Sequence, residues 1–277
     1  MSFSERLTDE EIQRYSRHIL LPEVGGKGQM RLKQSSVLIV GAGGLGSPVA
    51  LYLAAAGVGR IGLIDSDVVD TSNLQRQVLH DTAQLGRPKV ESGADRLRAI
   101  NPNITVETYY DRLGAENVAD LVSNYDVIVG GVDNFPARYL LNDACVMARK
   151  PLVEAGILKY DGMIMTIKPY EGPCYRCIFP EPPPPGTVPT CSEAGILGAL
   201  AGVMGSMQAF EALKLLLNIG EPLVGQMLMF EGLKGQFRTV EWDRNPKCPV
   251  CGDHPTITTL TEYRIECDIH GKERYRR

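Results

Sequence analysis

The fold of this chain is decided by one short stretch, Ser36 to Pro48, which reads SVLIVGAGGLGSP. Its apolar run at 37–40 predicts a fully buried strand of a parallel sheet. Three glycines follow in G-x-G-x-x-G spacing: Gly41, Gly43 and Gly46. The unit therefore predicts a strand, a glycine turn and a helix, an arrangement that brings backbone N–H groups and a helix N-terminus up to a bound phosphate.

The residues next to the glycine turn extend this prediction. Ser47 is placed to cap the helix and Pro48 to be its first residue. Asp65 ends the next strand, where a carboxylate can hold a ribose hydroxyl. These features alone also allow a nicotinamide or flavin dehydrogenase, so residues further along the chain must decide the class of enzyme.

Composition limits the class of protein. The chain has 277 residues, 44% of them hydrophobic, which suffices for one large core or two fused halves. Its net charge of −4 gives no support to bulk binding of nucleic acid or of an anionic membrane. Residues 1–11 are polar and charged, which is unlike a signal peptide. Seven cysteines without such a signal indicate a reducing, cytoplasmic setting, where thiols bind metal or react.

The first half of the chain alternates predicted strands and helices, which predicts a Rossmann-like α/β half with a mainly parallel sheet. A helix capped by Thr8 and a short helix near 28–34 precede the decisive stretch. Further helices are expected from Pro48 to Gly57, from Pro88 to Ile100 and over 142–149, and further strands at 61–65, 106–110, 127–129 and 152–153.

Past Gly156 the pattern changes to short strands between glycine turns, which is typical of an antiparallel meander. These strands are expected at 163–167, 226–230 and 236–242, and the six prolines of 180–189 predict an extended loop. An apolar helix is expected over 194–217, with glycines at spacings of three or four: Gly195, Gly198, Gly202 and Gly205. Its uncharged part is shorter than the ~20 residues a bilayer needs, which favours a buried or dimer-interface helix over a membrane span.

Two C-x-x-C pairs give the strongest metal signal in the chain. Four thiolates suit a tetrahedral zinc ion, and two such pairs make a redox dithiol the weaker alternative. Because the pairs are far apart in sequence, zinc would fasten the C-terminal segment to the middle of the chain as a structural ion. The predicted ligands are Cys174, Cys177, Cys248 and Cys251.

Three charged residues follow elements of the nucleotide-binding half. No Walker-type lysine follows the glycine turn, so Arg76 and Lys89 are the candidates to neutralise a bound triphosphate. Asp133 comes at the carboxyl end of a strand and is the candidate ligand of Mg²⁺ on the same phosphates. Each of these residues alone is most often a surface ion.

Seven motifs in order along the chain resemble one family, the MoeB/ThiF/HesA-type sulfur-carrier adenylyltransferases, bacterial relatives of ubiquitin-activating enzymes. The resemblance covers about residues 14–256. The motifs are Arg14-Tyr15-Ser16-Arg17-His18, Gly41 to Pro48, Ser72 to Gln77, Asp133-Asn134 with Arg138, Cys174 to Pro180, Cys191 to Gly195, and Cys248 to Gly252.

The resemblance implies a substrate and a reaction. Such enzymes use Mg·ATP to join AMP to the C-terminal Gly-Gly carboxylate of a small ubiquitin-like carrier such as MoaD or ThiS. They release pyrophosphate, and a sulfur donor then makes a thiocarboxylate. The implied cofactors are ATP, Mg²⁺ and Zn²⁺. The resemblance leaves open whether the pathway is molybdopterin, thiazole or another thiolation route.

The resemblance also assigns roles to individual residues. Arg17 would reach the phosphates of the neighbouring subunit in a homodimer, and Cys191 is a candidate for a covalent link to the carrier. The expected nucleotide-binding residues are Gly41, Gly43, Gly44, Asp65, Ser72, Asn73, Leu74, Gln75, Arg76, Lys89, Asp133 and Asn134.

The implied organisation is a single ThiF-type domain over 1–277. N-terminal helices (1–30) precede a nucleotide-binding half (31–155) and a carrier-binding, zinc-containing half (156–277). Some relatives continue into a rhodanese domain, and the short segment from Glu262 to Arg277 leads us to expect that a separate protein donates the sulfur. The alternatives to adenylylation are an NAD-dependent oxidoreductase and a catalytically silent relative.

Overall fold

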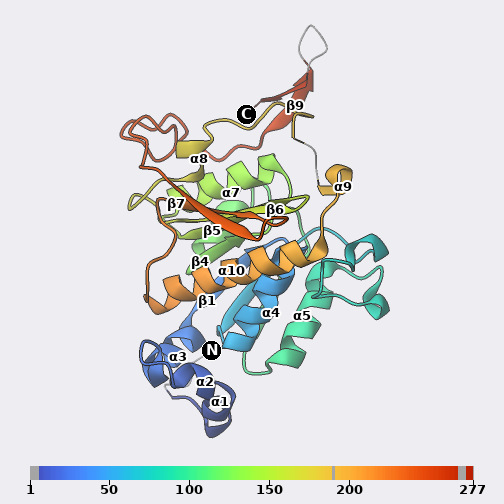
Figure 1. Ribbon diagram of the computed structural model, residues 1–277, viewed down its shortest axis with the longest axis vertical. Coiled ribbons are helices and arrows are strands. Elements are labelled where there is room, and N and C mark those ends of the chain that lie inside the picture. The colour runs from blue at the N-terminus through green and yellow to red at the C-terminus, as the bar shows by residue number, and fades with distance from the viewer. Residues whose placement is uncertain (1–5, 189–190, 268–272, 277) are drawn as a thin grey trace.

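The computed structural model describes residues 6–188, 191–267 and 273–276. Its centre is an eight-stranded sheet with the order β3-β2-β1-β4-β5-β6-β7-β8 (Figure 1). The strands from β3 to β5 pair in parallel, and β6, β7 and β8 continue the sheet in antiparallel pairing. The predicted α/β fold, a mainly parallel half continued by an antiparallel half, is confirmed. The strands are β1 Ser36–Val40, β2 Arg60–Ile64, β3 Thr105–Tyr109, β4 Val127–Gly130, β5 Leu152–Leu158, β6 Asp161–Ile167, β7 Gln226–Glu231 and β8 Gln236–Glu241.

Helices cover both faces of this sheet, because successive side chains of its strands point to opposite faces. In β1, Val37 and Ile39 pack into the core on one face, and Leu38 and Val40 into the core on the other. The first face is covered by α4 (Gly46–Ala56), α5 (Lys89–Ile100) and α10 (Gly198–Leu217), and the second by α6 (Val118–Ser123) and α7 (Phe135–Met147) (Figure 1).

The apolar helix α10 is a core helix. Among the described residues it is the one helix that is long and apolar enough to cross a membrane, with a mean hydropathy of 1.3 over its 18-residue window. Half of that window is buried, because α10 packs on α4 and on β4, β5 and β6. The predicted burial of this helix is confirmed.

Two of the four glycines expected on this helix make the close approach predicted from their spacing. A Cβ atom at Gly198 would collide with the Gln75 carbonyl, and one at Gly205 would collide with Pro48 and the Leu45 carbonyl. Gly202 has open space beside it. Gly195 lies outside α10 in the left-handed region (φ +75°), so it separates α10 from the short helix α9 (Cys191–Ala194).

The helix after the glycine turn begins earlier than predicted. Helix α4 starts at Gly46, and its cap position is Leu45 without a side-chain hydrogen bond. The Ser47 N–H already donates to the Gly43 carbonyl (2.9 Å), so helical hydrogen bonding begins inside the glycine turn. The prediction that Ser47 caps this helix is therefore wrong, and its buried hydroxyl oxygen has no hydrogen-bond partner.

Other helix ends follow the capping rules. Thr8 caps α1 (Asp9–Arg14) and exchanges hydrogen bonds with Glu11, as predicted. Helix α7 begins at Phe135 instead of residue 142, because the Asn134 side chain accepts a hydrogen bond from the Ala137 N–H (2.9 Å) and so caps the helix there. Helix α2 spans Ser16–Ile19, and α3 spans Gly25–Gln34, which begins before the predicted residue 28.

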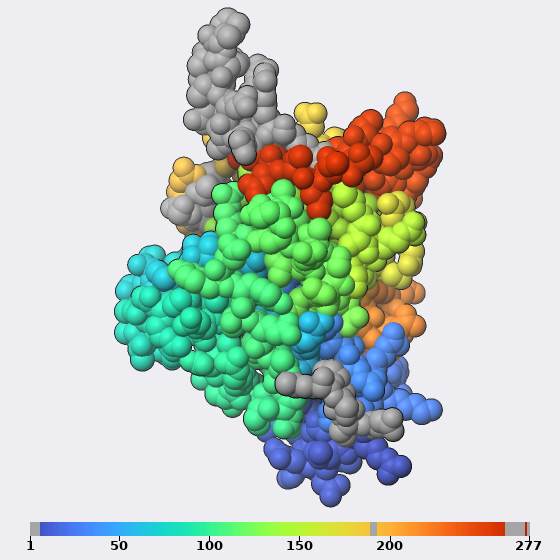
Figure 2. All heavy atoms as spheres, turned by 180° about the vertical axis from the view of Figure 1, so that it is seen from behind, coloured from blue at the N-terminus to red at the C-terminus, as the bar shows by residue number. Residues whose placement is uncertain are grey.

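The C-terminal segment returns to the body of the molecule after β8. Seen from behind, it runs across the top of the α6–α7 region, which Figure 2 shows as a red band over green atoms. It then forms a two-stranded antiparallel hairpin of β9 (Arg264–Cys267) and β10 (Glu273–Arg276). The remaining short helices are α8 (Tyr175–Ile178), η1 (Thr71–Asn73) and η2 (Thr82–Gln84).

Candidate active site

A cavity of about 570 Å³ opens at the carboxyl edge of the parallel strands. The chain after β1, β2 and β4 lines it, at the edge where open parallel sheets bind ligands. Eight of the predicted nucleotide-binding residues lie on its wall: Gly41, Gly43, Gly44, Asp65, Arg76, Lys89, Asp133 and Asn134. The fold thus brings together residues that are up to 93 positions apart, from Gly41 to Asn134.

The glycine turn is shaped by close backbone contacts. Gly41 lies in the left-handed region (φ +97°), and a Cβ atom there would come within 2.7 Å of the Gly131 carbonyl oxygen. A Cβ atom at Gly46 would collide with the carbonyl of Gly41. Since no side chain fits at either position, the turn keeps its backbone bare toward the cavity, as a phosphate site requires.

A buried histidine contacts the backbone of the glycine turn and supports it. His80 lies with one ring nitrogen, Nε2, 2.9 Å from the Ala42 carbonyl oxygen, and its Nδ1 lies 2.9 Å from the Ser92 hydroxyl. Because a carbonyl only accepts, Nε2 carries the proton and donates to Ala42. Burial lowers the pKa of His80, which keeps the ring neutral and suited to this arrangement.

Asp65 joins the glycine turn to the chain after β2. Its carboxylate accepts hydrogen bonds from the N–H groups of Ala42 and Asp67, each at 2.8 Å, while it faces the cavity. Burial raises the pKa of Asp65, and the nearby Lys89 charge and these two hydrogen bonds oppose the rise. The same carboxylate therefore holds the turn in place and remains at the cavity wall.

The two predicted cations approach the glycine turn from separate segments. The Lys89 ammonium is buried and pairs with Asp67 (2.7 Å). Arg76 donates to the Ser72 carbonyl (3.0 Å), and its aliphatic part lies against Gly44. Two positive charges at one end of the cavity make that end suitable for the phosphates of a nucleotide.

Asp133 and Asn134 follow β4 at the mouth of the cavity, and the Asp133 carboxylate is exposed. Below them lies a buried ion pair, Arg138 with Glu154 (3.1 Å). Arg138 also donates to the Val132 carbonyl (3.3 Å) and to the Ala155 carbonyl (3.1 Å), so it ties the loop that carries Asp133 to β5. An exposed carboxylate on a fixed loop fits the oxygen ligands that Mg²⁺ prefers.

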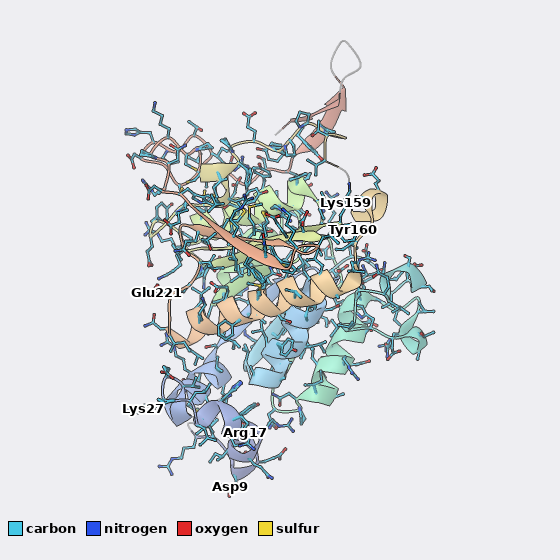
Figure 3. All side chains as sticks on the ribbon, viewed as in Figure 1. Asp9, Arg17, Lys27, Lys159, Tyr160 and Glu221 are labelled. Atoms are coloured by element: carbon cyan, nitrogen blue, oxygen red, sulfur yellow. The ribbon has the colours of Figure 1, made fainter. Side chains whose placement is uncertain are left out.

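Some predicted residues lie away from this cavity. Ser72, Asn73, Leu74 and Gln75 form the turn at and after η1 and are not among the residues that line the cavity. Arg17 is exposed in α2, beside the amino edge of the sheet, because α3 leads directly into the start of β1 (Figure 3). The side chain of Cys191 lies outside the described part of the chain, although its backbone begins α9.

The cavity also includes residues that sequence reasoning missed as site residues. Gln77 is buried on its wall with an unpaired carbonyl oxygen, and Leu113 and Phe135 supply apolar surface. Gln77 is the last residue of the Ser72 to Gln77 motif, so its motif position was the available signal. Leu113 had none, because it lies in a loop whose place depends on the order of strands in the sheet.

The far end of the cavity is mainly apolar. Strands β5 and β6 contribute Gly156, Ile157 and Met163, with exposed Asp161 where β6 begins, and Val188 and Ile196 close it from the segments before and after α9. The turn between β5 and β6 holds this closure, because the Leu197 N–H donates to the Lys159 carbonyl (3.2 Å; Lys159 is labelled in Figure 3). One continuous cavity therefore joins a cationic end to an apolar end.

The four predicted zinc ligands come together. Their sulfur atoms all lie within 4.8 Å of one another, and the two closest pairs are Cys174 with Cys248 (3.5 Å) and Cys177 with Cys251 (3.3 Å). Tetrahedral zinc with bonds of about 2.3 Å sets its sulfur ligands roughly 3.8 Å apart. The cluster fits a structural Zn²⁺ that fastens the chain near 250 to the chain near 175, as predicted.

A second cleft of about 630 Å³ lies at the opposite, amino edge of the sheet. Its cations already have partners in the fold. Arg31 donates to the Leu217 carbonyl at the end of α10 (3.4 Å), Lys214 donates to the Glu221 carbonyl (2.8 Å), and Lys168 pairs with Glu171 (2.5 Å). The cavity at the carboxyl edge, where the predicted residues gather, is therefore the candidate active site.

Comparison with known proteins gives close relatives. A sulfur carrier protein adenylyltransferase of Thermus thermophilus is 51% identical over 269 residues, which cover 95% of this chain and 99% of the relative. The adenylyltransferase and sulfurtransferase MOCS3 of Mus musculus is 50% identical over 271 residues, which cover 98% of this chain and 59% of that protein. The chain thus spans less than two thirds of the second relative's length.

Solved structures share the fold. Escherichia coli MccB crystallised with ATP has a TM-score of 0.76 and 25% sequence identity, covering 86% of this chain and 74% of that chain. The model of the ThiF family matches residues 15–250. The predicted enzyme class, a nucleotidyltransferase of the adenylyltransferase type, is confirmed by these relatives over the dehydrogenase alternative. The chain belongs to the ThiF family.

Proposed function

We propose that this enzyme adenylylates the C-terminal carboxylate of a small, ubiquitin-like sulfur-carrier protein that ends in Gly-Gly. The observation that carries the proposal is the single cavity with a cationic end and an apolar end. ATP would place its phosphates on the glycine turn between Arg76 and Lys89, with its ribose at Asp65. The carrier's C-terminal tail would enter from the apolar end and bring its carboxylate to the α-phosphate.

The apolar end is the proposed place for the carrier's tail. Gly156, Ile157 and Met163 line it from β5 and β6, and Val188 and Ile196 line it from the segments before and after α9. Two terminal glycines would offer the carboxylate on a bare backbone, which can lie flat against such a lining.

The reaction needs positioning and charge neutralisation more than a proton-transfer base. The carboxylate oxygen attacks the α-phosphorus, and the bond from that phosphorus to the leaving pyrophosphate breaks. Arg76 and Lys89 would neutralise the charge that develops on the phosphates. Mg²⁺, held by Asp133 with Asn134 beside it, would supply further positive charge. The carrier then ends in a mixed anhydride with AMP.

A homodimer explains the position of Arg17. Within one protomer, β1 separates the N-terminal helices from the cavity by the length of a strand, about 16 Å for five residues. Apolar side chains are exposed on the face near those helices, namely Leu20, Leu21, Tyr52, Val203 and Phe210. Pairing of two copies over this face would cover these side chains and carry Arg17 to the partner's phosphates.

The sulfur donor is proposed to be a separate protein. Among the cysteines whose side chains the structure describes, Cys145 is fully buried, and burial raises its pKa well above the ordinary value. The other four form the metal cluster. None of these five offers an exposed thiolate for a persulfide, and the side chains of Cys191 and Cys267 lie outside the described part of the chain. We expect enzyme, ATP and carrier alone to stop at the acyl-adenylate.

Carrier-dependent exchange of labelled pyrophosphate into ATP tests the proposal. Small carriers ending in Gly-Gly should support exchange, and the same carriers shortened by the two glycines should not. Adding a persulfide donor should then yield thiocarboxylate, detected by mass spectrometry. Exchange that is independent of any carrier would contradict the proposed substrate, and thiocarboxylate without a donor would contradict the separate sulfur source.

A further inference from the structure

The segment after the second C-x-x-C pair, residues 256–263, lies beyond the matched family region of 15–250. Hydrogen bonds and apolar contacts fix the position of this segment. The N–H groups of Thr256 and Ile257 both donate to the Pro249 carbonyl (2.9 and 2.8 Å), which fixes the segment to the cysteine knuckle. Ile257, Leu260 and Tyr263 then pack against the apolar core under α6 and α7. We call residues 256–263 the C-terminal brace.

The C-terminal brace ends on the loop that follows β3. The Glu262 carboxylate accepts a hydrogen bond from the Ala115 N–H (3.2 Å), and its other oxygen lies 3.7 Å from the Arg112 guanidinium. Asp111, Arg112 and Leu113 of this loop line the candidate nucleotide cavity. A single side chain of the brace thus contacts the wall of the cavity from outside.

A second contact fixes the brace beside Glu262. Arg176, which lies between two of the cysteines, donates from Nη1 to the Tyr263 hydroxyl oxygen (2.9 Å). Its guanidinium is held in turn by Asp143, at 2.7 and 2.9 Å. The Tyr263 ring meets the Tyr139 ring edge-on, with centroids 5.7 Å apart. The position of Glu262 is therefore set by the buried knuckle and not by the loop that it contacts.

The order of the strands indicates which part of a nucleotide meets this loop. The glycine turn follows β1, Asp65 follows β2, and the 111–113 loop follows β3, the next strand outward. In folds of this kind the phosphates lie at the first position and the ribose at the second. By this order the nucleobase would lie beyond the ribose, beside buried Leu113. Phe135, which follows β4, lines the same cavity.

We propose that Glu262 is a positioning residue for the nucleobase of ATP. It acts by holding the 111–115 loop, and with it the Leu113 side chain, in place at the cavity wall, and the C-terminal brace links that loop to the cysteine knuckle. This inference rests on the proposed binding of ATP in the cavity. It assigns a role to a segment outside the matched family region and to a residue that touches neither phosphate nor metal.

Calorimetric titration of the full chain with Mg·ATP and with Mg·tripolyphosphate tests this role, because only ATP carries a base. In Glu262→Ala the dissociation constant for ATP should rise about three- to tenfold. A factor of this size corresponds to the free energy of one hydrogen bond together with the loss of order in the loop that it holds. The constant for tripolyphosphate should stay within about twofold of wild type. Glu262→Gln keeps an acceptor for the Ala115 N–H and should restore most of the affinity.

Two further variants separate positioning from general destabilisation. Tyr263→Phe removes only the hydrogen bond from Arg176, and should raise the ATP constant by a smaller factor than Glu262→Ala. Asp95→Asn removes an exposed ion pair with Arg87 (3.0 Å) on α5, away from the cavity wall, and should change neither constant.

The outcomes are distinct. A Glu262→Ala protein that binds ATP as wild type does would overturn the inference and leave the proposed function intact. An equal loss for ATP and tripolyphosphate would overturn it as well, because the loop would then act on the whole site. Failure of the wild-type protein to bind ATP, whether or not it binds tripolyphosphate, would contradict the proposed nucleotide site and with it the role of Glu262. If Glu262→Ala does not fold, Tyr263→Phe decides alone: unchanged ATP affinity contradicts the inference.

Discussion

The core around the parallel strands and the cysteine knuckle are stabilised by different interactions. Strands β1, β2 and β4 are almost fully buried, and they pack against apolar side chains of helices that include α4 and α10. The chain near 175 and near 250 is held by four cysteines and by the buried ion pair of Arg176 with Asp143, and the edge strand β8 is exposed along its whole length. Hydrophobic burial dominates around the parallel strands, and specific cross-links dominate at the knuckle.

This difference predicts whether a substitution in each region will lower activity or stability. Substitutions at the carboxyl edge of the parallel sheet should remove activity and leave the fold intact, because the side chains there face a cavity. Substitutions in the cysteine knuckle should act first on stability. Four substitutions test this contrast, and their expected effects decrease from Asp133 to Cys191.

Asp133→Ala should reduce carrier-dependent pyrophosphate exchange by at least about a hundredfold, since positive charge at the phosphates is the main source of transition-state stabilisation here. The Asp133 carboxylate is exposed, so the melting temperature should hardly change. Exchange kinetics and a thermal scan measure both effects. Exchange at near wild-type rates in a folded Asp133→Ala protein would remove Asp133 from the site.

Cys248→Ala should release the metal and lower the stability by several kcal/mol, a large part of the roughly 5–15 kcal/mol of a typical domain. Elemental analysis and denaturant unfolding measure the two effects. Cys145→Ala is the matched control, because it removes a buried thiol outside the cluster and should keep the metal. Wild-type protein without bound zinc would show that the cluster is not a zinc site.

His80 should make stability depend on pH through the glycine turn. Its pKa is lowered in the fold, so the unfolded chain binds more protons, and stability falls as the pH drops below about 6.5, the ordinary histidine value. In His80→Gln, urea unfolding between pH 7.5 and 5.5 should show a shallower decline. An unchanged slope would mean that other groups cause the pH dependence.

Cys191→Ser should have the smallest effect on adenylation. The residue begins α9 after the proline-rich loop. Adenylation and covalent capture of the carrier are separate steps, and the proposed adenylation step uses no thiol. We expect pyrophosphate exchange to stay near wild type, while a reducible enzyme–carrier adduct is lost from non-reducing gels run with ATP and the sulfur donor. An adduct that persists in Cys191→Ser would assign the link to another residue.

Sequence patterns predicted the parts of this protein that depend on neighbouring residues. The strand and glycine turn at 36–46 follow from local burial and from backbone conformations that only glycine adopts without strain. The cysteine ligands follow from spacing within each knuckle, and the cap of α1 follows from a side chain three residues from its partner. The start of α7 was predicted seven residues too late, although its cap, Asn134, is equally local. Even so, local rules misplaced the cap of α4 at Ser47, because the glycine turn itself supplies the first helical carbonyl.

Tertiary structure alone decided which distant residues share the cavity. The order β3-β2-β1-β4-β5 puts Leu113 on its wall and Arg17 beside the opposite edge, although Arg17 lies nearer to the glycine turn in sequence. The contact of Glu262 with Ala115 spans 147 positions. No local pattern encodes such contacts, because they depend on how the whole sheet is ordered and on which surfaces the core leaves at its edges.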